Sequence, residues 1–420
     1  MSKRRTKRRV IALAFITVCV IAACVFSRFG GFGTGPSADV DEFSRYAQPV
    51  SEITIPEGTQ IVALGEATHG NKEFQELKLE VLQVLAQRHN VRAFALEADA
   101  GGCELVNRYI HGGAGTLDEA LQNLDFTLYR TNQMAELISW MRTYNETAAP
   151  GDDLRFYGFD LQNYEHSHQL LLEEMRARGL DTAGLESLGE LRATSDGADH
   201  DLIQTTYTSA RQQLEALGSD QDTACALHLT DCLLANSELS AAIDSAEGPA
   251  MRDRFMAQNV LWVASQEEQR GNQPILISGH NGHIEQQGSY GPDAKVMGNL
   301  LADELDDAYY AIGTDFFEAE VSLPRGNGRM THTFYSHDPL AKAAALAGLE
   351  VCWLDFAKVP SASPLTPFIA EPIMMGSVGE GFSPLMYVLP QTYRIKRAPR
   401  DPYDSMIFVA HAHPTEQAAQ

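Results

Sequence analysis

The sequence of 420 residues contains little cysteine and few basic residues. Six cysteines are too few for a scaffold held together by disulfides, which excludes that class of small secreted protein. Lys and Arg number 32 against 56 Asp and Glu, giving a net charge of −24, and six of the basic residues lie within residues 1–9. The rest of the chain therefore carries 26 basic against 56 acidic residues, a net charge of −30. So acidic a body repels phosphate backbones, which excludes nucleic-acid binding.

Several familiar catalytic motifs do not occur in the sequence. It has no G-x-S-x-G, which disfavours a serine hydrolase of the α/β type, and neither an H-E-x-x-H helix nor a phosphate-binding P-loop. Hydrophobic residues at 44% and charged residues at 21% are ordinary for a globular protein. If this chain hydrolyses a bond, the sequence therefore indicates water as the nucleophile.

One apolar run stands out near the N-terminus. Residues 1–9 are strongly basic, residues 10–26 are apolar, and residues 27–38 are rich in Gly, Ser and Pro. The pattern predicts a region, residues 1–38, that anchors or exports the chain and leaves the body outside the cytoplasm at the cell membrane. Three forms stay open: an uncleaved transmembrane signal anchor, a lipoprotein lipidated at Cys24 of the sequence IAAC, and a cleaved secretion signal.

Short apolar runs recur along the body, and each is followed by an ionisable side chain. The runs cover residues 61–65, 91–96, 154–159, 275–279 and 309–314, and the residues that follow them are Glu66, Glu97, Asp160, His280 and Asp315. Such runs are typical of buried parallel strands. Residues 73–89 have helical apolar spacing, so residues 61–97 predict strand, helix and parallel strand. The carboxyl ends of these strands then share one sheet edge, where we expect Glu66 and Glu97 to converge.

The fold class predicted is therefore α/β, with a mostly parallel central sheet flanked by helices. Residues 164–250 are rich in Leu, Ala, Glu and Gln, and we interpret them as an inserted helical cap. This divides the α/β core into a first half at residues 39–163 and a second half at residues 251–420, with later strands at 351–356 and 406–410.

Two motifs carry histidines beside predicted strand ends. The first is GEATHG at residues 65–70, which places His69 near the start of a helix, and the second is HNGH at residues 280–283. The positive end of a helix favours a neutral imidazole, whereas a nearby carboxylate favours a charged one, so the charge of His69 stays open. Together with the carboxylates along the same edge, these histidines predict a general acid–base site.

At these motifs the chain resembles the erythromycin esterase family. The similarity extends over about residues 50–410 and is strongest in GEATHG, ALEAD (95–99), VNRYI (106–110), LISWMR (137–142), FYGFD (156–160), RDRFMAQN (252–259) and HNGH. The resemblance implies an α/β core with a helical cap that hydrolyses the lactone of macrolide antibiotics, and hence a role in antibiotic resistance. In that family a histidine activates water without a covalent intermediate.

Carried over residue by residue, the resemblance implies that His69 is the general base and that Glu66 and Glu97 orient it or polarise the water. It implies that His280 and His283 stabilise the oxyanion or protonate the leaving alkoxide. Asp160 is expected to contact the substrate or to support these residues. The chain departs from the family at two other positions expected to have the same kind of role. Lys78 stands where the family usually has Arg, and the segment with Tyr129 lacks the family's Trp and acidic residue. A Lys keeps the charge but loses the bidentate fork of Arg.

The leading hypothesis is thus a carboxylic ester hydrolase that acts on a small-molecule ester or lactone and needs no cofactor. One alternative is a metal-dependent hydrolase in which Glu66, Glu97, His280 and His69 bind Zn²⁺ or Mn²⁺. Another is a non-catalytic ligand-binding protein outside the cytoplasm. A surface polysaccharide or lipid ester is an alternative substrate to a macrolide.

Overall fold

The computed structural model describes residues 15–20, 35–194, 199–218, 221–291, 294–325, 328–379, 381–387, 389–416 and 418. Of the apolar run at 10–26, only residues 15–20 are described, and they are helical. No helix within the described ranges is both long enough and apolar enough to cross a membrane. Cys24 lies outside those ranges, so the anchor, the signal and the lipidation stay predictions.

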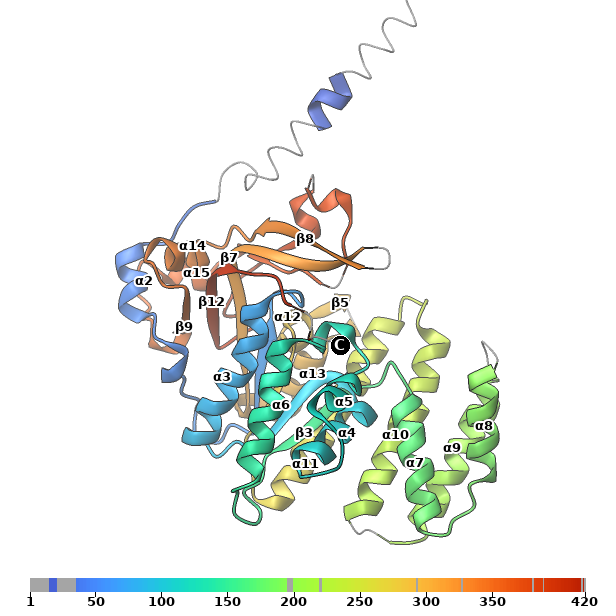
Figure 1. Ribbon diagram of the computed structural model, residues 1–420. Helices are drawn as coiled ribbons and strands as arrows, with labels where there is room; N and C mark the ends of the chain where they lie inside the picture. Colours follow the sequence, from blue (N-terminus) through green and yellow to red (C-terminus); the bar gives the residue numbers. More distant parts are fainter. Residues whose placement is uncertain are drawn as a thin grey trace, which may run out of the picture. The chain divides into compact units, whose positions relative to one another are not determined.

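The chain divides into two compact units. The first unit comprises Met1–Ile53, Gly65–Leu77 and Ile312–Glu416, and the second comprises Thr54–Leu64, Lys78–Ala311 and Gln417–Gln420. The strands are mixed but mostly parallel, and helices flank them (Figure 1). This confirms the predicted α/β class.

In the second unit, strand β2 (Ala93–Asp99) pairs in parallel with β3 (Arg155–Asp160) and with β4 (Ile275–His280). The first residues of β1 (Ile61–Glu66) lie next to β4 in the sheet, so β4 lies between β1 and β2. Every residue of β1 and β2 is buried, which explains their continuous apolar runs. Because β2, β3 and β4 are parallel, their carboxyl ends lie along one edge of the sheet.

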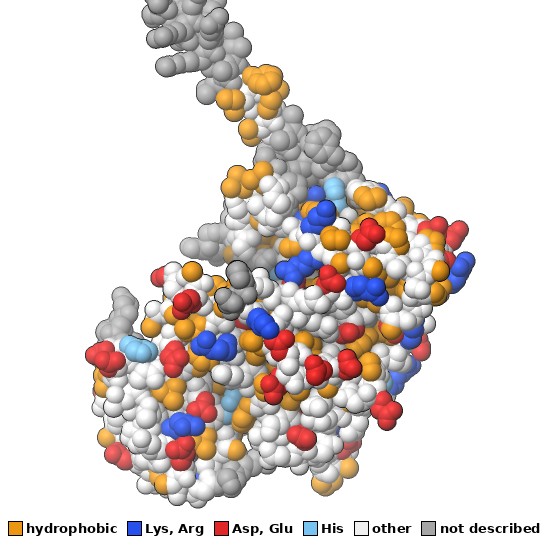
Figure 2. All heavy atoms as spheres, turned by 180° about the vertical axis from the view of Figure 1, so that it is seen from behind, with side chains coloured by type: hydrophobic (Ala, Val, Ile, Leu, Met, Phe, Trp, Pro, Cys, Tyr) orange, Lys and Arg blue, Asp and Glu red, His pale blue; other side chains and the backbone are white. Residues whose placement is uncertain are grey.

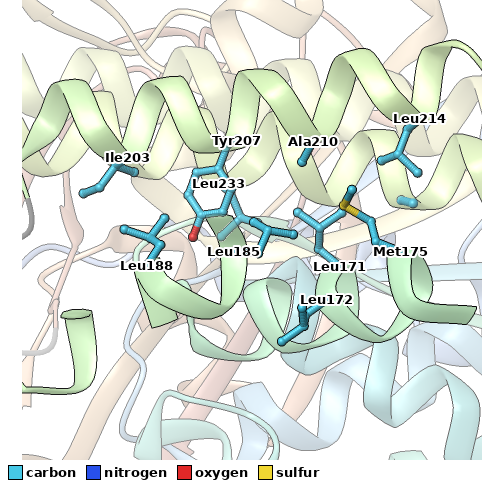
Figure 3. Packing of buried hydrophobic residues seen from close by; sticks show 11 residues of the cluster. Leu171, Leu172, Met175, Leu185, Leu188, Ile203, Tyr207, Ala210, Leu214 and Leu233 are labelled. Carbon is cyan, nitrogen blue, oxygen red and sulfur yellow. The ribbon is translucent and has the colours of Figure 1, made fainter. Parts of the chain in front are cut away.

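Helices dominate the chain between β3 and β4. These are α7 (Glu165–Ala177), α8 (Ala183–Thr194), α9 (His200–Glu215), α10 (Gln221–Ala242) and α11 (Gly248–Arg270). Side chains from α7 to α10 pack into one apolar cluster (Figure 3), which includes Leu171, Met175, Leu185, Leu188, Tyr207, Leu214 and Leu233. Burial of each such Leu stabilises the packing by about 1.5–3 kcal/mol. The helices expected at 164–250 are present, and their status as an inserted cap stays a prediction.

In the first unit, the long strand β7 (Tyr309–Arg325) pairs in parallel with β12 (Ser405–Ala412) and antiparallel with β8 (Gly328–Tyr335). Strand β9 (Val351–Asp355) pairs antiparallel with β12. The predicted strand at 309–314 is only the start of β7, whereas those at 351–356 and 406–410 correspond to β9 and β12. Helix α3 (Lys72–Arg88), expected at 73–89, begins in this unit.

Acidic and basic side chains are interspersed on one face of the molecule (Figure 2). On the face shown in Figure 2, Asp and Glu side chains are distributed with Lys and Arg side chains between them. The net charge of −24 is therefore not gathered into one patch on that face.

Candidate functional site

The first unit holds a buried histidine and glutamate at the carboxyl end of β1. His69 Nδ1 lies 3.3 Å from Glu66 Oε2, and the two residues are three positions apart. Glu66 is fully buried and His69 is 9% exposed. A carboxylate accepts hydrogen bonds, so Nδ1 carries the proton in this contact and Nε2 of the neutral ring can accept one. We call these two residues the histidine–glutamate pair.

Side chains from neighbouring turns fix this pair. Gln75, on the first turns of α3, donates its amide to Glu66 Oε2 at 3.1 Å and to the carbonyl oxygen of His69 at 3.4 Å. Asn71 donates to the carbonyl oxygen of Glu320 in β7 at 2.8 Å. These bonds hold the turn between β1 and α3 on both sides, so the imidazole is attached to a rigid frame.

The same turn requires glycine at position 70. A β carbon at Gly70 would lie 2.3 Å from the carbonyl oxygen of Ser322, closer than any carbon contact allows. Three residues before Gly70, the backbone N–H of Ala67 donates to Thr314 Oγ1 at 2.8 Å. The turn therefore packs directly against β7, which explains the glycine at the end of GEATHG.

The second unit holds a cluster of charged side chains around one guanidinium. Arg252 Nη2 donates to Glu97 Oε1 at 2.8 Å and to Asp160 Oδ2 at 2.7 Å, and Nε donates to Asp160 Oδ1 at 3.1 Å. Arg252 Nη1 lies 3.2 Å from His283 Nε2, and His283 Nδ1 lies 2.6 Å from Asp253 Oδ1. We call these five residues the arginine cluster. The bidentate contact with Asp160 is among the strongest polar contacts that proteins make.

His280 lies at the edge of the arginine cluster. Its backbone N–H donates to Glu97 Oε2 at 2.7 Å, and its Nδ1 accepts the backbone N–H of Gly282 at 3.1 Å. A β carbon at Gly279 would lie 2.7 Å from Glu97 Oε2, so the strand end leaves room for this carboxylate only with glycine there. The HNGH motif therefore positions Glu97 through its backbone as well as supplying two imidazoles.

Charge sets the ionisation of the arginine cluster. Burial opposes the charged ring of His283, but the carboxylates of Glu97 and Asp253 outweigh it and raise the pKa of His283 above its usual value. Burial likewise opposes the charge of Arg252, and Asp160 and Glu97 outweigh it, which raises the pKa of the guanidinium further. The neighbouring carboxylates thus favour the charged forms of both His283 and Arg252.

Asp99 adds a further acidic group at the end of β2. Burial first, and then the charge of Asp160, raises the pKa of Asp99 to about 8. Asn163 donates to both carboxylate oxygens, through its backbone N–H and its side-chain amide, each at 2.7 Å. Burial and Asp160 thus favour the protonated carboxyl, whereas the two hydrogen bonds from Asn163 favour the carboxylate.

Lys78 and Tyr129, both predicted to support the site, are brought together in the second unit. Lys78 Nζ lies 5.8 Å from the centre of the Tyr129 ring, within cation–π range. Both side chains are buried, at 0% and 1% exposure. The proposed substrate contact of Tyr129 stays a prediction.

A cleft of about 680 Å³ opens at the start of α11. Its lining includes Met251 and Arg254, which flank Arg252 and Asp253 in the chain, together with Gly291 of strand β5 (Ser289–Gly291). This volume is in the range of sites for drug-sized molecules. The remaining lining is mainly Ala and Leu side chains with Glu247 and Lys295.

The structure thus joins Glu66 with His69, Lys78 with Tyr129, and Glu97, Asp160, His280 and His283 around Arg252. The convergence of Glu66 with Glu97 and the catalytic roles of all these residues stay predictions. Within the described part of the chain, no three or more His, Cys, Asp or Glu side chains are arranged to hold a metal ion.

The sequence predicted no role for Arg252 or Asp253, although both belong to the RDRFMAQN motif at residues 252–259. A signal was available for Asp253. It precedes Met256, Ala257 and Val260 at helical spacing, so it lies on the buried face of α11. A carboxylate on an apolar helix face needs a partner, and here that partner is His283.

Most of the chain matches one known protein family. The model of the family described as erythromycin esterase matches residues 86–412, more than three quarters of the chain. The chain belongs to the erythromycin esterase family. This confirms the resemblance and makes the chain a hydrolase of that kind.

Individual relatives agree with membership of the erythromycin esterase family. Erythromycin esterase type II of Escherichia coli is 22% identical over 324 residues, which cover 68% of this chain and 74% of that protein. A crystal structure of a succinoglycan biosynthesis protein aligns with a TM-score of 0.72 at 18% identity, covering 90% of this chain and 98% of that one. A mutant of the erythromycin esterase EreC, in its open conformation, aligns with a TM-score of 0.63 at 17% identity, covering 87% and 93%. At such identities the two structures establish the fold alone.

Proposed function

We propose that this chain hydrolyses a carboxylic ester or lactone and that His69 is the general base that activates water. The observation that carries the proposal is the 3.3 Å contact between His69 Nδ1 and the buried Glu66 carboxylate. A carboxylate on Nδ1 keeps the proton there, orients the ring and stabilises the imidazolium that forms when Nε2 takes a proton from water. Membership of the erythromycin esterase family supports the same chemistry.

The reaction needs no covalent enzyme intermediate. Water loses a proton to His69 Nε2 as its oxygen attacks the ester carbonyl carbon, and the carbonyl oxygen becomes an oxyanion. Collapse of this intermediate breaks the bond to the alkoxide, which leaves as an alcohol after taking a proton. We propose that turnover also depends on the arginine cluster, with His283 as a proton donor to an alkoxide.

The substrate proposed is a macrolactone. The name of the Escherichia coli relative supports this class, and the cleft of about 680 Å³ lined by Met251 and Arg254 has the volume for a molecule larger than a simple ester. Lactone opening on such a substrate adds one water to its mass and releases no second product.

Turnover of a panel tests this proposal. The full-length protein is mixed with macrolactones and with simple carboxylic esters, and mass spectrometry measures the gain of one water or the release of an alcohol. We expect His69→Ala to lower kcat by about 10²–10⁴-fold. His413→Ala removes an exposed imidazole from the same unit and serves as the matched control. Full activity in His69→Ala would exclude His69 as the base.

We further propose that the catalytic body works outside the cytoplasm, held by residues 1–38. The support is the sequence alone, namely the basic residues 1–9 and the apolar run at 10–26. Fractionation of cells that express the full chain, compared with a chain lacking residues 1–38, tests it. Recovery of the full chain only in the soluble cytoplasmic fraction would exclude it.

A further inference from the structure

We propose that Asp253 is a positioning residue that fixes the tautomer of His283, so that Nε2 is the atom through which His283 exchanges a proton during ester hydrolysis. The catalytic part rests on the function proposed above, whereas the tautomer can be tested without any substrate. Neither the motif comparison nor the family match assigns a role to Asp253.

The contact itself is short and shielded. Asp253 Oδ1 lies 2.6 Å from His283 Nδ1, and the exposed fractions of the two side chains are 0% and 14%. Asp253 lies on the second turn of α11, whereas His283 lies on the short helix α12 (Asn281–Ile284). The bond is therefore made by tertiary packing between elements, and the buried carboxylate of Asp253 holds the orientation of the His283 ring.

The second ring nitrogen has two partners of opposite kind. His283 Nε2 lies 3.2 Å from Arg252 Nη1, which can only donate, and 3.4 Å from Glu97 Oε1, which accepts. In the neutral ring Nε2 accepts from Arg252, and in the charged ring its N–H faces Glu97. Nε2 therefore has a hydrogen-bond partner both when it carries a proton and when it does not.

The other neutral tautomer is disfavoured by the same distances. A proton on Nε2 with none on Nδ1 would remove the acceptor that Nε2 offers to Arg252. It would also set the lone pair of Nδ1 against the Asp253 carboxylate at 2.6 Å. The second contact is repulsive in a site with little water to screen it.

Several other charged or titratable groups surround His283. Glu97 from β2 and Arg252 from α11 contact it directly, and Asp160 from β3 contacts it through Arg252. The ring of His280 lies 6.4 Å away between centroids, at the end of β4. Tyr290 from β5 lies by Asp253, and burial together with that carboxylate raises the pKa of its hydroxyl. Among these groups, the bond that Asp253 makes with Nδ1 is the shortest contact to the ring.

Nitrogen NMR of the histidine rings tests the tautomer. In the full-length chain with ¹⁵N-labelled histidine, the His283 signals are assigned by their loss in His283→Gln. Above the pKa of the ring we expect a protonated Nδ1 and an unprotonated Nε2. Asp253→Asn should shift this population toward the Nε2–H form, because an amide N–H can donate to Nδ1. A wild-type ring protonated on Nε2 alone would overturn the proposal.

Kinetics tests the consequence for catalysis. We expect Asp253→Asn to lower kcat by about 10²-fold or more with KM little changed, and Asp253→Glu to recover part of the loss. The matched control is Glu268→Gln, which removes an exposed carboxylate from the same helix. Circular dichroism and thermal unfolding show which variants fold, and Asp253→Glu, which keeps the carboxylate, supplies a second test if Asp253→Asn does not fold.

The outcomes separate the two proposals. An Nδ1–H tautomer with full activity in Asp253→Asn overturns the role of Asp253 and leaves the esterase function standing. A wild-type chain that hydrolyses no ester overturns the function and with it the catalytic role of Asp253, while the NMR result still decides the tautomer.

Discussion

Arg252 Nη1 and His283 Nε2 lie 3.2 Å apart, so a permanent cation faces a ring nitrogen that exchanges protons. The two charges are compatible only because carboxylates surround them. Glu97 and Asp160 bind the guanidinium, and Asp253 binds the other side of the ring. The arginine cluster is therefore a set of mutually dependent charges, and removal of any one should affect the others.

Replacement of Arg252 by Gln should destabilise the fold as well as lower activity. The change leaves Glu97 and Asp160, which are almost fully buried, without their cation, and the loss of one partner of a buried ion pair costs about 3–5 kcal/mol. Denaturant unfolding measures the difference. Arg108→Gln serves as control, since Arg108 is 48% exposed and its pairing with Glu104 should contribute less than about 1 kcal/mol. Equal losses in both variants would contradict the importance of the buried pair.

Replacement of Glu66 by Gln should lower kcat by roughly 10²-fold and leave KM nearly unchanged. The amide keeps the shape of the side chain but does not stabilise an imidazolium at His69. Steady-state kinetics on an ester that the wild type hydrolyses measures this. Glu76→Gln serves as control, because Glu76 lies next to Gln75 on α3 with its side chain 43% exposed. A rise in KM with unchanged kcat would instead place Glu66 in substrate binding.

Gly70→Ala should lower activity through the backbone. The added carbon, 2.3 Å from Ser322 O, forces the turn that carries His69 away from β7. We expect a loss of both thermal stability and kcat. In Gly379→Ala, where nothing lies within 4 Å of the new carbon, neither should change much. A fully active Gly70→Ala would mean that the turn can move without displacing the imidazole.

A buried pair of carboxyl groups in the first unit should make the fold less stable as the pH rises. Burial raises the pKa of Asp338 from 3.8 to about 6, and burial together with the charge of Asp338 raises the pKa of Asp315 well above its usual value. Between about pH 4 and pH 6 and above, the folded state binds more protons than the unfolded state, so the free energy of unfolding falls with rising pH.

Asp338→Asn removes one of these titrating groups and can still cap helix α14 (Pro339–Leu346) through its side-chain oxygen. We expect its free energy of unfolding to fall less than that of the wild type between pH 4 and pH 8. Asp401→Asn, at an exposed position, should follow the wild-type curve. Parallel curves for Asp338→Asn and the wild type would exclude the carboxyl pair as the cause.

Sequence alone predicted the strands that are buried on both faces, because burial leaves an unbroken apolar run. Strands β1 and β4 begin and end within one residue of the predicted runs and their following ionisable residues. The second half of β7 and its partner β8 were not predicted. Exposed or partly exposed residues interrupt the apolar pattern of this antiparallel pair, among them Glu318 and Glu320 in β7.

Most of the residues proposed for the site can likewise be selected from the sequence. Glu66, His69, Glu97, Asp160, His280 and His283 follow strands, so the rule of parallel sheet edges selects them. The positions of Arg252 and Asp253 depend on how the start of α11 packs against the ends of β2 and β3, and no local pattern encodes that packing. Charge pairing between elements distant in the chain is a tertiary property.

The bonds of Arg252 have a consequence for assembly. The Arg252 side chain joins α11, which begins at residue 248, to β2 and β3, which begin at residues 93 and 155. The charges of these three segments are therefore compensated only when all three have docked. If α11 detaches, the buried carboxylates of Glu97 and Asp160 lose their counterion. The free-energy cost of that state is larger than the loss of one contact would be. Docking of this helix is therefore cooperative. The arginine cluster should therefore reach its full stability only when all three segments have docked.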